Sequence, residues 1–317
     1  MALQLARGGI DVRLGGVMEL ELLDEMATAG ENARYLPGVS FPSNLNAFRN
    51  IEECIDAVRD VLLVVPSHGL RTTLTTIQPL LDDRSRVCWA TKGFELHTGK
   101  LPHQVAAEVL GVARPVAVLS GPTFAKEVGA GLPTALTIAA SDANFADDLA
   151  VALSAENFRA YTSDDMVGVE VGGAVKNVLA IGAGMSDGLG FGANTRIALI
   201  NRGLAEMTRL GVALGAKQET FMGLAGMGDL VLTCTDNLSR NRRMGLALAS
   251  GKSVDEAKEE IQQVVEGVMA AEAVNEVAEK LEIEMPICHQ IYRILYEDAE
   301  PREAVGALMS RQLRSEN

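Results

Sequence analysis

Residues 169–177 have the sequence VEVGGAVKN, which places a single lysine, Lys176, in a glycine-rich and largely apolar run. The composition predicts a helix that is small or aliphatic on nearly every face, so the ammonium group would have no easy path to water. Burial disfavours the charged form of a lysine, and a lysine that readily gives up its proton suits proton transfer. The alternative is a side chain that extends past the glycines to the surface. The run on its own leaves both alternatives open.

The sequence pattern changes shortly before this segment. From Asp11 to Tyr161, short apolar runs alternate with helical patterns, which is typical of a parallel sheet with crossover helices. We expect strands near residues 12–14, 61–65, 87–90, 116–119, 135–139 and 158–161. Beyond residue 163 helical periodicity continues to the end. The sequence therefore predicts an α/β, doubly wound (Rossmann-like) domain over residues 1–162 and an all-α domain over residues 163–317.

Composition and charge exclude several classes of function. The 317 residues, 48% of them hydrophobic, suit two globular domains, and a net charge of -14 argues against nucleic acid or an anionic membrane as partner. No segment resembles a signal peptide and no apolar run approaches the ~20 residues of a membrane span, so we expect no membrane insertion and a cytoplasmic location. The four cysteines form no CxxC pair, so neither a metal site nor a disulfide framework is indicated.

Small, polar or cationic residues follow three of the expected strands, as PSH (66–68), TKG (91–93) and SGPT (120–123). Ligands of such sheets bind beyond the carboxyl ends of the strands. We expect Gly121-Pro122-Thr123 to open a helix whose free amides receive a phosphate or carbonyl oxygen. Lys92 adds a cation at the same sheet edge. The alternative is that these are ordinary strand-to-helix turns, with Lys92 solvated.

Two further motifs lie in the helical part. AGMGDL (225–230) is a glycine-rich turn that presents Asp229, and SRNRR (239–243) holds three arginines within four residues. The planar fork of arginine suits a phosphate or a carboxylate. The alternative is a basic helix start paired with surrounding acids. QVVEG (263–267) is expected to begin a helix, and residues 271–308 to form packed helices without chemistry of their own.

Seven motifs taken together resemble those of bacterial NAD(P)-dependent glycerol-3-phosphate dehydrogenase. They are PSH, TKG, SGPTFAKE, GGAVKN, AGMGDL, TCTDNLSRNRR and QVVEG, in this order and over essentially the whole chain from Ala2. The resemblance implies reversible reduction of dihydroxyacetone phosphate to sn-glycerol 3-phosphate with NADH or NADPH, feeding glycerophospholipid synthesis. A small-molecule substrate is implied, and a homodimer is left open.

The resemblance also implies roles for individual residues. Lys176 is similar to the general acid/base of the family. The implied substrate-binding residues are Lys92, Gly121, Thr123, Lys176, Asp229, Ser239, Arg240 and Asn241. The implied cofactor-binding residues are Lys92, Ala125, Arg240, Val264 and Glu266. No metal is implied.

The sequence departs from the family pattern in the cofactor half. The first strand and its Gly-x-Gly-x-x-Gly turn are not found, and residues 2–9 match the end of the helix that should follow them. Gly15, Gly16 and Val17 stand where the family has tryptophan, glycine and a basic residue, so no preference for NADPH is implied. We expect that the chain as numbered starts late and binds dinucleotide weakly. The alternatives are an inactive truncated homologue and a dehydrogenase for another phosphorylated or carboxylated hydroxy compound.

Overall fold

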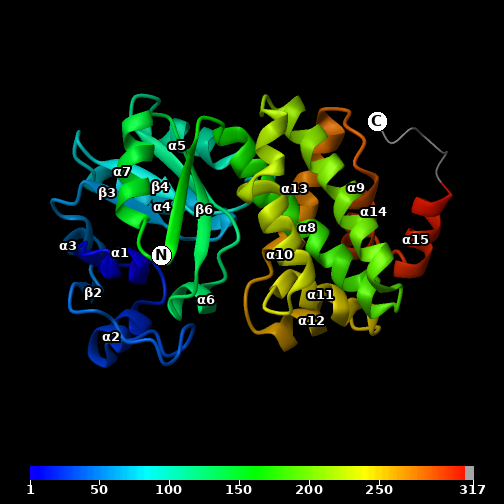
Figure 1. Cartoon of the computed structure of the whole chain (residues 1–317), viewed down its shortest axis with the longest axis horizontal. Coiled ribbons are helices and arrows are strands. Elements are labelled where there is room, and N and C mark those ends of the chain that lie inside the picture. Colours follow the sequence, from blue (N-terminus) through cyan, green and yellow to red (C-terminus); the bar gives the residue numbers. More distant parts are fainter. Residues whose placement is uncertain (311–317) are drawn as a thin grey trace. The chain divides into compact units, whose positions relative to one another are not determined.

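The computed structural model describes residues 1–310, which divide into two compact units. The first unit comprises Met1–Lys92 and Pro102–Val169, and the second comprises Gly93–Leu101 and the chain from Glu170 onward. The strands belong to the first unit, whereas the second is helical (Figure 1). The domain limits at residues 162 and 163 stay a prediction.

The first unit is built on a five-stranded sheet with the order β3-β4-β5-β6-β7. The strands are β3 (Asp60–Leu63), β4 (Arg86–Trp89), β5 (Val116–Ser120), β6 (Thr134–Ala140) and β7 (Phe158–Ser163). Neighbouring strands are parallel except β5 and β6, which run antiparallel. The expectation of a wholly parallel sheet is therefore wrong at one pair. The β5–β6 connection holds only the five-residue α6 (Ala125–Gly129), not a full crossover helix, and the chain turns back.

A second, two-stranded sheet pairs β1 (Val12–Leu14) with β2 (Leu45–Ala47) in parallel. All six predicted strands are present, and β2 is the one that the sequence pattern missed. The helices beside this sheet are α1 (Ala2–Arg7), α2 (Leu20–Ala29) and α3 (Ile51–Ile55). The expected helix end is confirmed, because α1 stops at Gly8 and Gly9 has a positive φ of 86°. Within the described residues β1 pairs only with β2, and β3 only with β4.

Helices cover both faces of the five-stranded sheet. All four residues of β4 are buried, as expected for a strand inside two helical layers. On one face, α7 (Ala143–Leu153) places Phe145 and Leu149 against Leu119 and Ile138. The remaining helices of this unit are α4 (Ser67–Ile77) and α5 (Pro102–Leu110), which pack against each other, with α5 also contacting β5.

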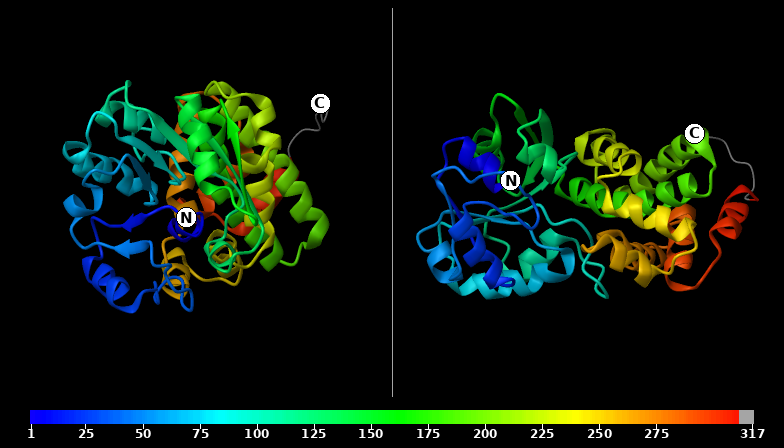
Figure 2. Two further views of the ribbon diagram at one scale, coloured as in Figure 1. Left: turned by 60° about the vertical axis from the view of Figure 1, so that its left-hand side comes forward. Right: turned by 90° about the horizontal axis from the view of Figure 1, so that it is seen from below.

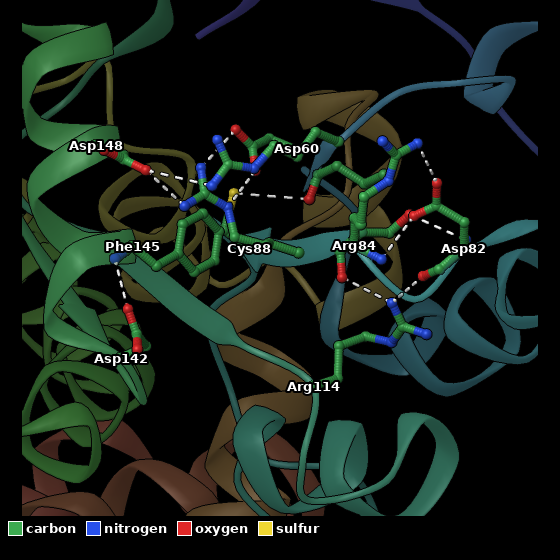
Figure 3. A network of polar contacts seen from close by, with 12 residues as sticks. Asp60, Asp82, Arg84, Cys88, Arg114, Asp142, Phe145 and Asp148 are labelled. Atoms are coloured by element: carbon green, nitrogen blue, oxygen red, sulfur yellow. Dashed lines mark hydrogen bonds and ion pairs between the residues drawn. The ribbon is translucent and has the colours of Figure 1, made fainter.

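An arginine network fixes the amino-terminal end of this sheet (Figure 3). The guanidinium group of Arg86 donates two hydrogen bonds to Asp60, at 2.6 and 2.8 Å, and one to Asp148 at 2.6 Å. It also lies 4.3 Å from the centre of the Phe145 ring. The side chain is only 8% exposed, so its charge needs these partners. The network joins β3, β4 and α7 at the edge opposite the carboxyl ends of β3 and β4.

The second unit is organised around α8 (Met166–Gly188). The other helices are α9 (Gly192–Ala213), α10 (Asp229–Thr235), α11 (Arg240–Ala249), α12 (Val254–Ile261), α13 (Glu266–Lys280), α14 (Pro286–Tyr296) and α15 (Pro301–Met309). Figure 2 shows this helical part from two further directions. By length and composition α8 could cross a membrane, so the expectation that no run is long enough is wrong. Its most apolar stretch is, however, 89% buried inside the protein, as in a core helix.

Glycines allow α8 and α11 to approach until their backbones touch. A Cβ atom on Gly245 would overlap the carbonyl oxygen of Ile181 and lie 2.6 Å from the amide nitrogen of Met185. In return, a Cβ on Gly184 would overlap the carbonyl oxygen of Arg242. Backbone atoms cannot rotate away as a flexible side chain can. This pair of glycines therefore sets the distance between the two helices.

We expect Gly245→Ala to lower the free energy of unfolding by about 1–3 kcal/mol or more, because the two helices must separate. Thermal or urea denaturation measures the change. Gly306→Ala is the matched control, since nothing lies within 4 Å of the added methyl group on α15. The control should be neutral or slightly stabilising, as alanine favours helix. Equal stability of Gly245→Ala and the unmodified protein would contradict this account of the helix packing.

Glu206 is a buried acid on α9 that faces the start of α14. Its carboxylate accepts hydrogen bonds from the backbone amides of Ile287, at 2.7 Å, and Cys288, at 3.1 Å. Desolvation by burial raises the pKa of Glu206 to about 7, although the two backbone hydrogen bonds act in the opposite direction. The folded protein therefore holds this proton at pH values where the unfolded chain releases it. The stabilisation is present below about pH 4.5 and is lost as the pH rises through about 7.

We expect the unmodified protein to lose stability relative to Glu206→Gln as the pH rises from 4.5 to 8. The loss in the free energy of unfolding should reach up to about 3 kcal/mol. Glutamine does not titrate, so the variant lacks this contribution to the pH dependence. Urea unfolding at several pH values measures it. Glu256→Gln is a control on α12: hydrogen bonds from Ser253 lower the pKa of Glu256, so its effect should not change over this range. A constant difference for Glu206→Gln would contradict the prediction.

Candidate active site

Lys176 is buried in the middle of α8, with 7% of its surface exposed. Its Nζ donates a hydrogen bond to Oδ1 of Asp229 at 2.6 Å and another to Oγ1 of Thr233 at 3.0 Å. The alternative of a side chain that reaches the surface is therefore wrong. Asp229 is 1% exposed, so both charges of this ion pair are removed from water.

The local structure explains why two residues of α10 meet Lys176. Asp229 and Thr233 are one helical turn apart and so lie on the same face. The Thr233 hydroxyl donates to the backbone carbonyl of Asp229 at 2.6 Å, which turns its oxygen toward the lysine. The expected glycine turn before Asp229 is a π-helical turn, Leu224–Gly228, packed closely against α8 where Gly172 meets Ala225. Single π-turns are frequent at functional sites.

Asp229 changes the electrostatics expected for Lys176. Burial disfavours the ammonium form, but a carboxylate at 2.6 Å favours it. The pair therefore supports a positively charged lysine with a fixed orientation, which is the form that donates a proton. The neighbouring Cys234 offers no nucleophile, because burial raises the pKa of its thiol to about 12.

The arginine motif forms the first turn of α11. Ser239 caps this helix by accepting a hydrogen bond from the amide of Arg242 at 3.2 Å. Arg240 is partly exposed and its side chain forms no hydrogen bond or ion pair within the described residues. Arg242 points inward and binds Asp187 at 2.6 Å. The alternative prediction, that the arginines at this helix start pair with acidic side chains, is therefore correct for Arg242 and not for Arg240.

Asn241 connects three helices of the second unit. Its side-chain amide donates to Oδ1 of Asn177 at 2.8 Å, and its own Oδ1 accepts the backbone amide of Gly267 at 2.9 Å. Asn177 follows Lys176 on α8, and Gly267 lies in the first turn of α13. Sequence reasoning missed Asn177 and Thr233. The available signals were the place of Asn177 beside the lysine and the spacing of four residues between Asp229 and Thr233.

The QVVEG motif lies at the start of α13, as the sequence predicts. Val264 is 47% exposed. Glu266 is the first residue of the helix, is partly exposed, and makes no side-chain hydrogen bond within residues 1–310. Both side chains are therefore accessible to a ligand. The hydrogen bond from Gly267 to Asn241 fixes this helix start relative to the arginine motif.

In the first unit, three of the predicted site residues lie together beyond β4 and β5. Nζ of Lys92 lies 3.5 Å from the carbonyl oxygen of Gly121, and the hydroxyl of Thr123 donates to the same oxygen at 3.2 Å. Gly121 has a φ of 150°, and a Cβ there would lie 2.9 Å from the Cα of Leu136. The expected helix start is wrong by a few residues: α6 begins at Ala125, which is exposed, and Pro122 precedes it.

The predicted residues thus form separate groups in the two units. Lys92, Gly121 and Thr123 meet in the first unit, and Lys176 meets Asp229 in the second. Asn241 fixes the first turns of α11 and α13, which carry Ser239, Arg240 and Glu266. Among residues 1–310 no group of three or more His, Cys, Asp or Glu side chains could hold a metal ion. The four cysteines are unpaired and buried.

Comparison with known proteins places these groups in a family. Residues 1–146 match the family model for the N-terminus of NAD-dependent glycerol-3-phosphate dehydrogenase, and residues 165–306 match the model for its C-terminus. Glycerol-3-phosphate dehydrogenase [NAD(P)+] of Aliivibrio fischeri is 53% identical, over 100% of this chain and 92% of the relative. The enzyme of the same name from Bartonella henselae is 52% identical, over 100% and 93%.

A solved structure supports the same assignment. The crystal structure of glycerol-3-phosphate dehydrogenase from Coxiella burnetii matches with a TM-score of 0.95 and 49% sequence identity, over 98% of this chain and 94% of that one. The fold, the motifs and the relatives agree over nearly the full length. The chain therefore belongs to the family of NAD(P)-dependent glycerol-3-phosphate dehydrogenases.

Proposed function

We propose that this protein interconverts dihydroxyacetone phosphate and sn-glycerol 3-phosphate with NADH or NADPH. The observation that carries the proposal is the buried Lys176, held at 2.6 Å from Asp229 and at 3.0 Å from Thr233. A buried ammonium group with a fixed orientation suits proton transfer, and two relatives that match the whole chain are named glycerol-3-phosphate dehydrogenase [NAD(P)+]. The matches span 92% and 93% of the two relatives' length, which favours an active enzyme over an inactive truncated homologue.

Lys176 acts as the general acid when the ketone is reduced. Its ammonium group donates a proton to the oxygen of the substrate carbonyl as negative charge develops there. Asp229 and Thr233 hold Nζ in one place, so little reorganisation is needed when the proton moves. In the reverse direction the amine accepts the proton of the alcohol. Asp229 thereby contributes through orientation and charge.

The first turn of α11 binds the substrate phosphate. Arg240 carries a charge that no described residue neutralises, and the fork of arginine suits phosphate oxygens. Ser239 and Asn241 lie at either side of it, and the bond from Asn241 to Asn177 ties this turn to the helix of Lys176. Lys92, Gly121 and Thr123 complete the set of proposed substrate contacts. Binding the phosphate end of a small substrate fixes the orientation of its carbonyl.

A nicotinamide dinucleotide fits the residues that are accessible. Ala125 and Val264 are exposed, and the side chains of Arg240 and Glu266 form no internal hydrogen bond within the described part of the chain. These residues and Lys92 would hold it. When bound, the dinucleotide supplies the hydride. Gly15, Gly16 and Val17 offer no cation for a 2'-phosphate, so NADH is included beside NADPH.

The proposed setting is the cytoplasm, where the product feeds glycerophospholipid synthesis. That two copies associate as a homodimer stays a prediction. The proposal is tested by following oxidation of NADH and NADPH with dihydroxyacetone phosphate, with dihydroxyacetone as the control that lacks the phosphate. We expect turnover only with the phosphorylated ketone. Turnover with another phosphorylated or carboxylated ketone alone would favour a different dehydrogenase, and no turnover at all would favour the inactive homologue.

We expect Lys176→Ala to lower kcat by about 100-fold or more, because the general acid is lost. The unfolding free energy should also fall, by about 3–5 kcal/mol, since the buried carboxylate of Asp229 loses the opposite charge of the lysine. The double variant Lys176→Ala/Asp229→Asn should regain part of that stability and remain inactive. Lys252→Ala is the control, a surface lysine paired with Glu260. If kcat of Lys176→Ala fell by less than threefold, Lys176 would not be the general acid and its role would be structural.

We expect Arg240→Ala to raise the KM for dihydroxyacetone phosphate by about 30-fold or more, which corresponds to a loss of about 2 kcal/mol of binding. Thermal stability should change little, because the side chain makes no hydrogen bond or ion pair with the part of the chain that the structure describes. Arg243→Ala removes the same charge from the same helix and should change KM less than threefold. If the two variants had the same KM, the binding would depend on overall charge and not on Arg240.

A further inference from the structure

Asp187, near the end of α8, neutralises two arginines from different helices. Its Oδ2 accepts a hydrogen bond from Nη2 of Arg242 at 2.6 Å, and Nη1 of Arg196 lies 2.9 and 2.8 Å from its two oxygens. The side chains of Asp187 and Arg242 are 12% and 10% exposed. No motif of the proposed function includes Asp187. A carboxylate placed between two largely buried guanidinium groups therefore needs an explanation.

Arg242 also holds the segment that leads into α11. A second nitrogen of its guanidinium group donates to the side chain of Asn237, in the loop between α10 and α11. Its backbone amide donates to Ser239, and its carbonyl oxygen lies against Gly184 of α8. The residue is thus fixed at its side chain, its amide and its carbonyl. Since Arg240 and Asn241 directly precede it, their positions on the helix are fixed as well.

The ion pair also separates the arginines by role. The motif holds three arginines within four residues, and any of them could face an anion. Arg242 binds Asp187, whereas Arg240 and Arg243 are partly exposed and their side chains make no hydrogen bond or ion pair within residues 1–310. Arg240 and Arg242 are two residues apart, about 200° around the helix, so a rotation of α11 that turned Arg240 inward would move Arg242 away from Asp187. The contact from Arg242 to Asp187 opposes that rotation because a buried arginine would lose its carboxylate.

We infer that Asp187 is a positioning residue for phosphate binding, which acts through Arg242 to hold Arg240 and Asn241 in place. This inference rests on the proposed function, because it deepens the role assigned to the first turn of α11. Asp187 touches neither Lys176 nor its partners Asp229 and Thr233 in the contacts described. Its loss should therefore weaken binding of the phosphate end while the proton-transfer step is retained.

The test compares Asp187→Asn with Arg240→Ala and with the double variant. We expect Asp187→Asn to raise the KM for dihydroxyacetone phosphate by about tenfold with kcat changed less than threefold, as misplacement of a binding group does. In the Arg240→Ala background the same substitution should add little, because the group that it positions is already gone. Full additivity of the two effects on KM would overturn the inference.

Asp148→Asn is the matched control, since Asp148 also receives a buried arginine, Arg86, but in the first unit. It should lower the melting temperature and leave KM unchanged; an equal rise of KM in the control would show that general destabilisation is responsible. If Asp187→Asn does not fold, Arg242→Lys replaces it, because lysine keeps the charge and cannot bind Asp187 and Asn237 together in the same fork geometry. An unchanged KM in that variant would contradict the inference.

A second readout separates this inference from the proposed function. Binding of glycerol 3-phosphate, measured by calorimetry without turnover, should be weakened by Asp187→Asn and not by Asp148→Asn. If the unmodified protein binds glycerol 3-phosphate but does not reduce the ketone, the proposed function fails, and the binding data still decide the role of Asp187. Equal affinity of Asp187→Asn and the unmodified protein would overturn the inference whatever the activity.

Discussion

The second unit depends on an ion pair that water does not reach. A lysine and an aspartate buried together lose most of their hydration, and only close geometry with additional hydrogen bonds offsets that cost. Lys176 and Asp229 meet this condition at 2.6 Å, and Thr233 supplies the further hydrogen bond. The ion pair therefore adds little net stability to the fold, but it forms only when α8 and α10 hold the two side chains at the right distance and angle. The π-helical turn before Asp229 and the glycines of α8 serve this geometry, because they let α10 come close enough to the lysine.

The second unit has two further polar contacts between helices, which join α11 to α8. Asp187 with Arg242, and Asn177 with Asn241, fasten α11 to α8 at two more places. Each contact joins a polar group on one helix to a polar group on another, and the side chains involved are buried or nearly so. Because each polar group would be costly to leave without its partner, the helices can pack in few other ways. The proposed reactive and binding groups are thus held by hydrogen bonds and ion pairs between buried polar side chains.

Much of this could be predicted from the sequence. Apolar runs identified six strands, and the change of pattern near residue 163 identified the helical part. The direction of β6 was not predictable, since strand periodicity carries no sense of direction and the short α6 gave no clear signal. β2 (Leu45–Ala47) was missed because two of its three residues are asparagine and alanine, which are depleted in strands. Motifs indicated Lys176, Asp229 and Arg240 as candidate site residues, whereas the partners Asn177, Thr233 and Asp187 became evident only from contacts between helices. The sequence does not distinguish the three arginines of this motif. In the structure they differ because only Arg242 of the three binds the carboxylate of Asp187.

The burial of α8 on all sides has a consequence for motion. Every residue from Gly168 to Ser186 is buried, so its backbone amides should exchange with solvent deuterium only when the whole unit unfolds. We therefore expect the helix of the proposed acid to exchange slowly. The residues proposed to meet the substrate phosphate and the cofactor stand at helix starts and loop ends, where local opening costs less. The proposed proton donor therefore stands on a buried helix, whereas the proposed ligand contacts stand at more accessible helix starts and loop ends.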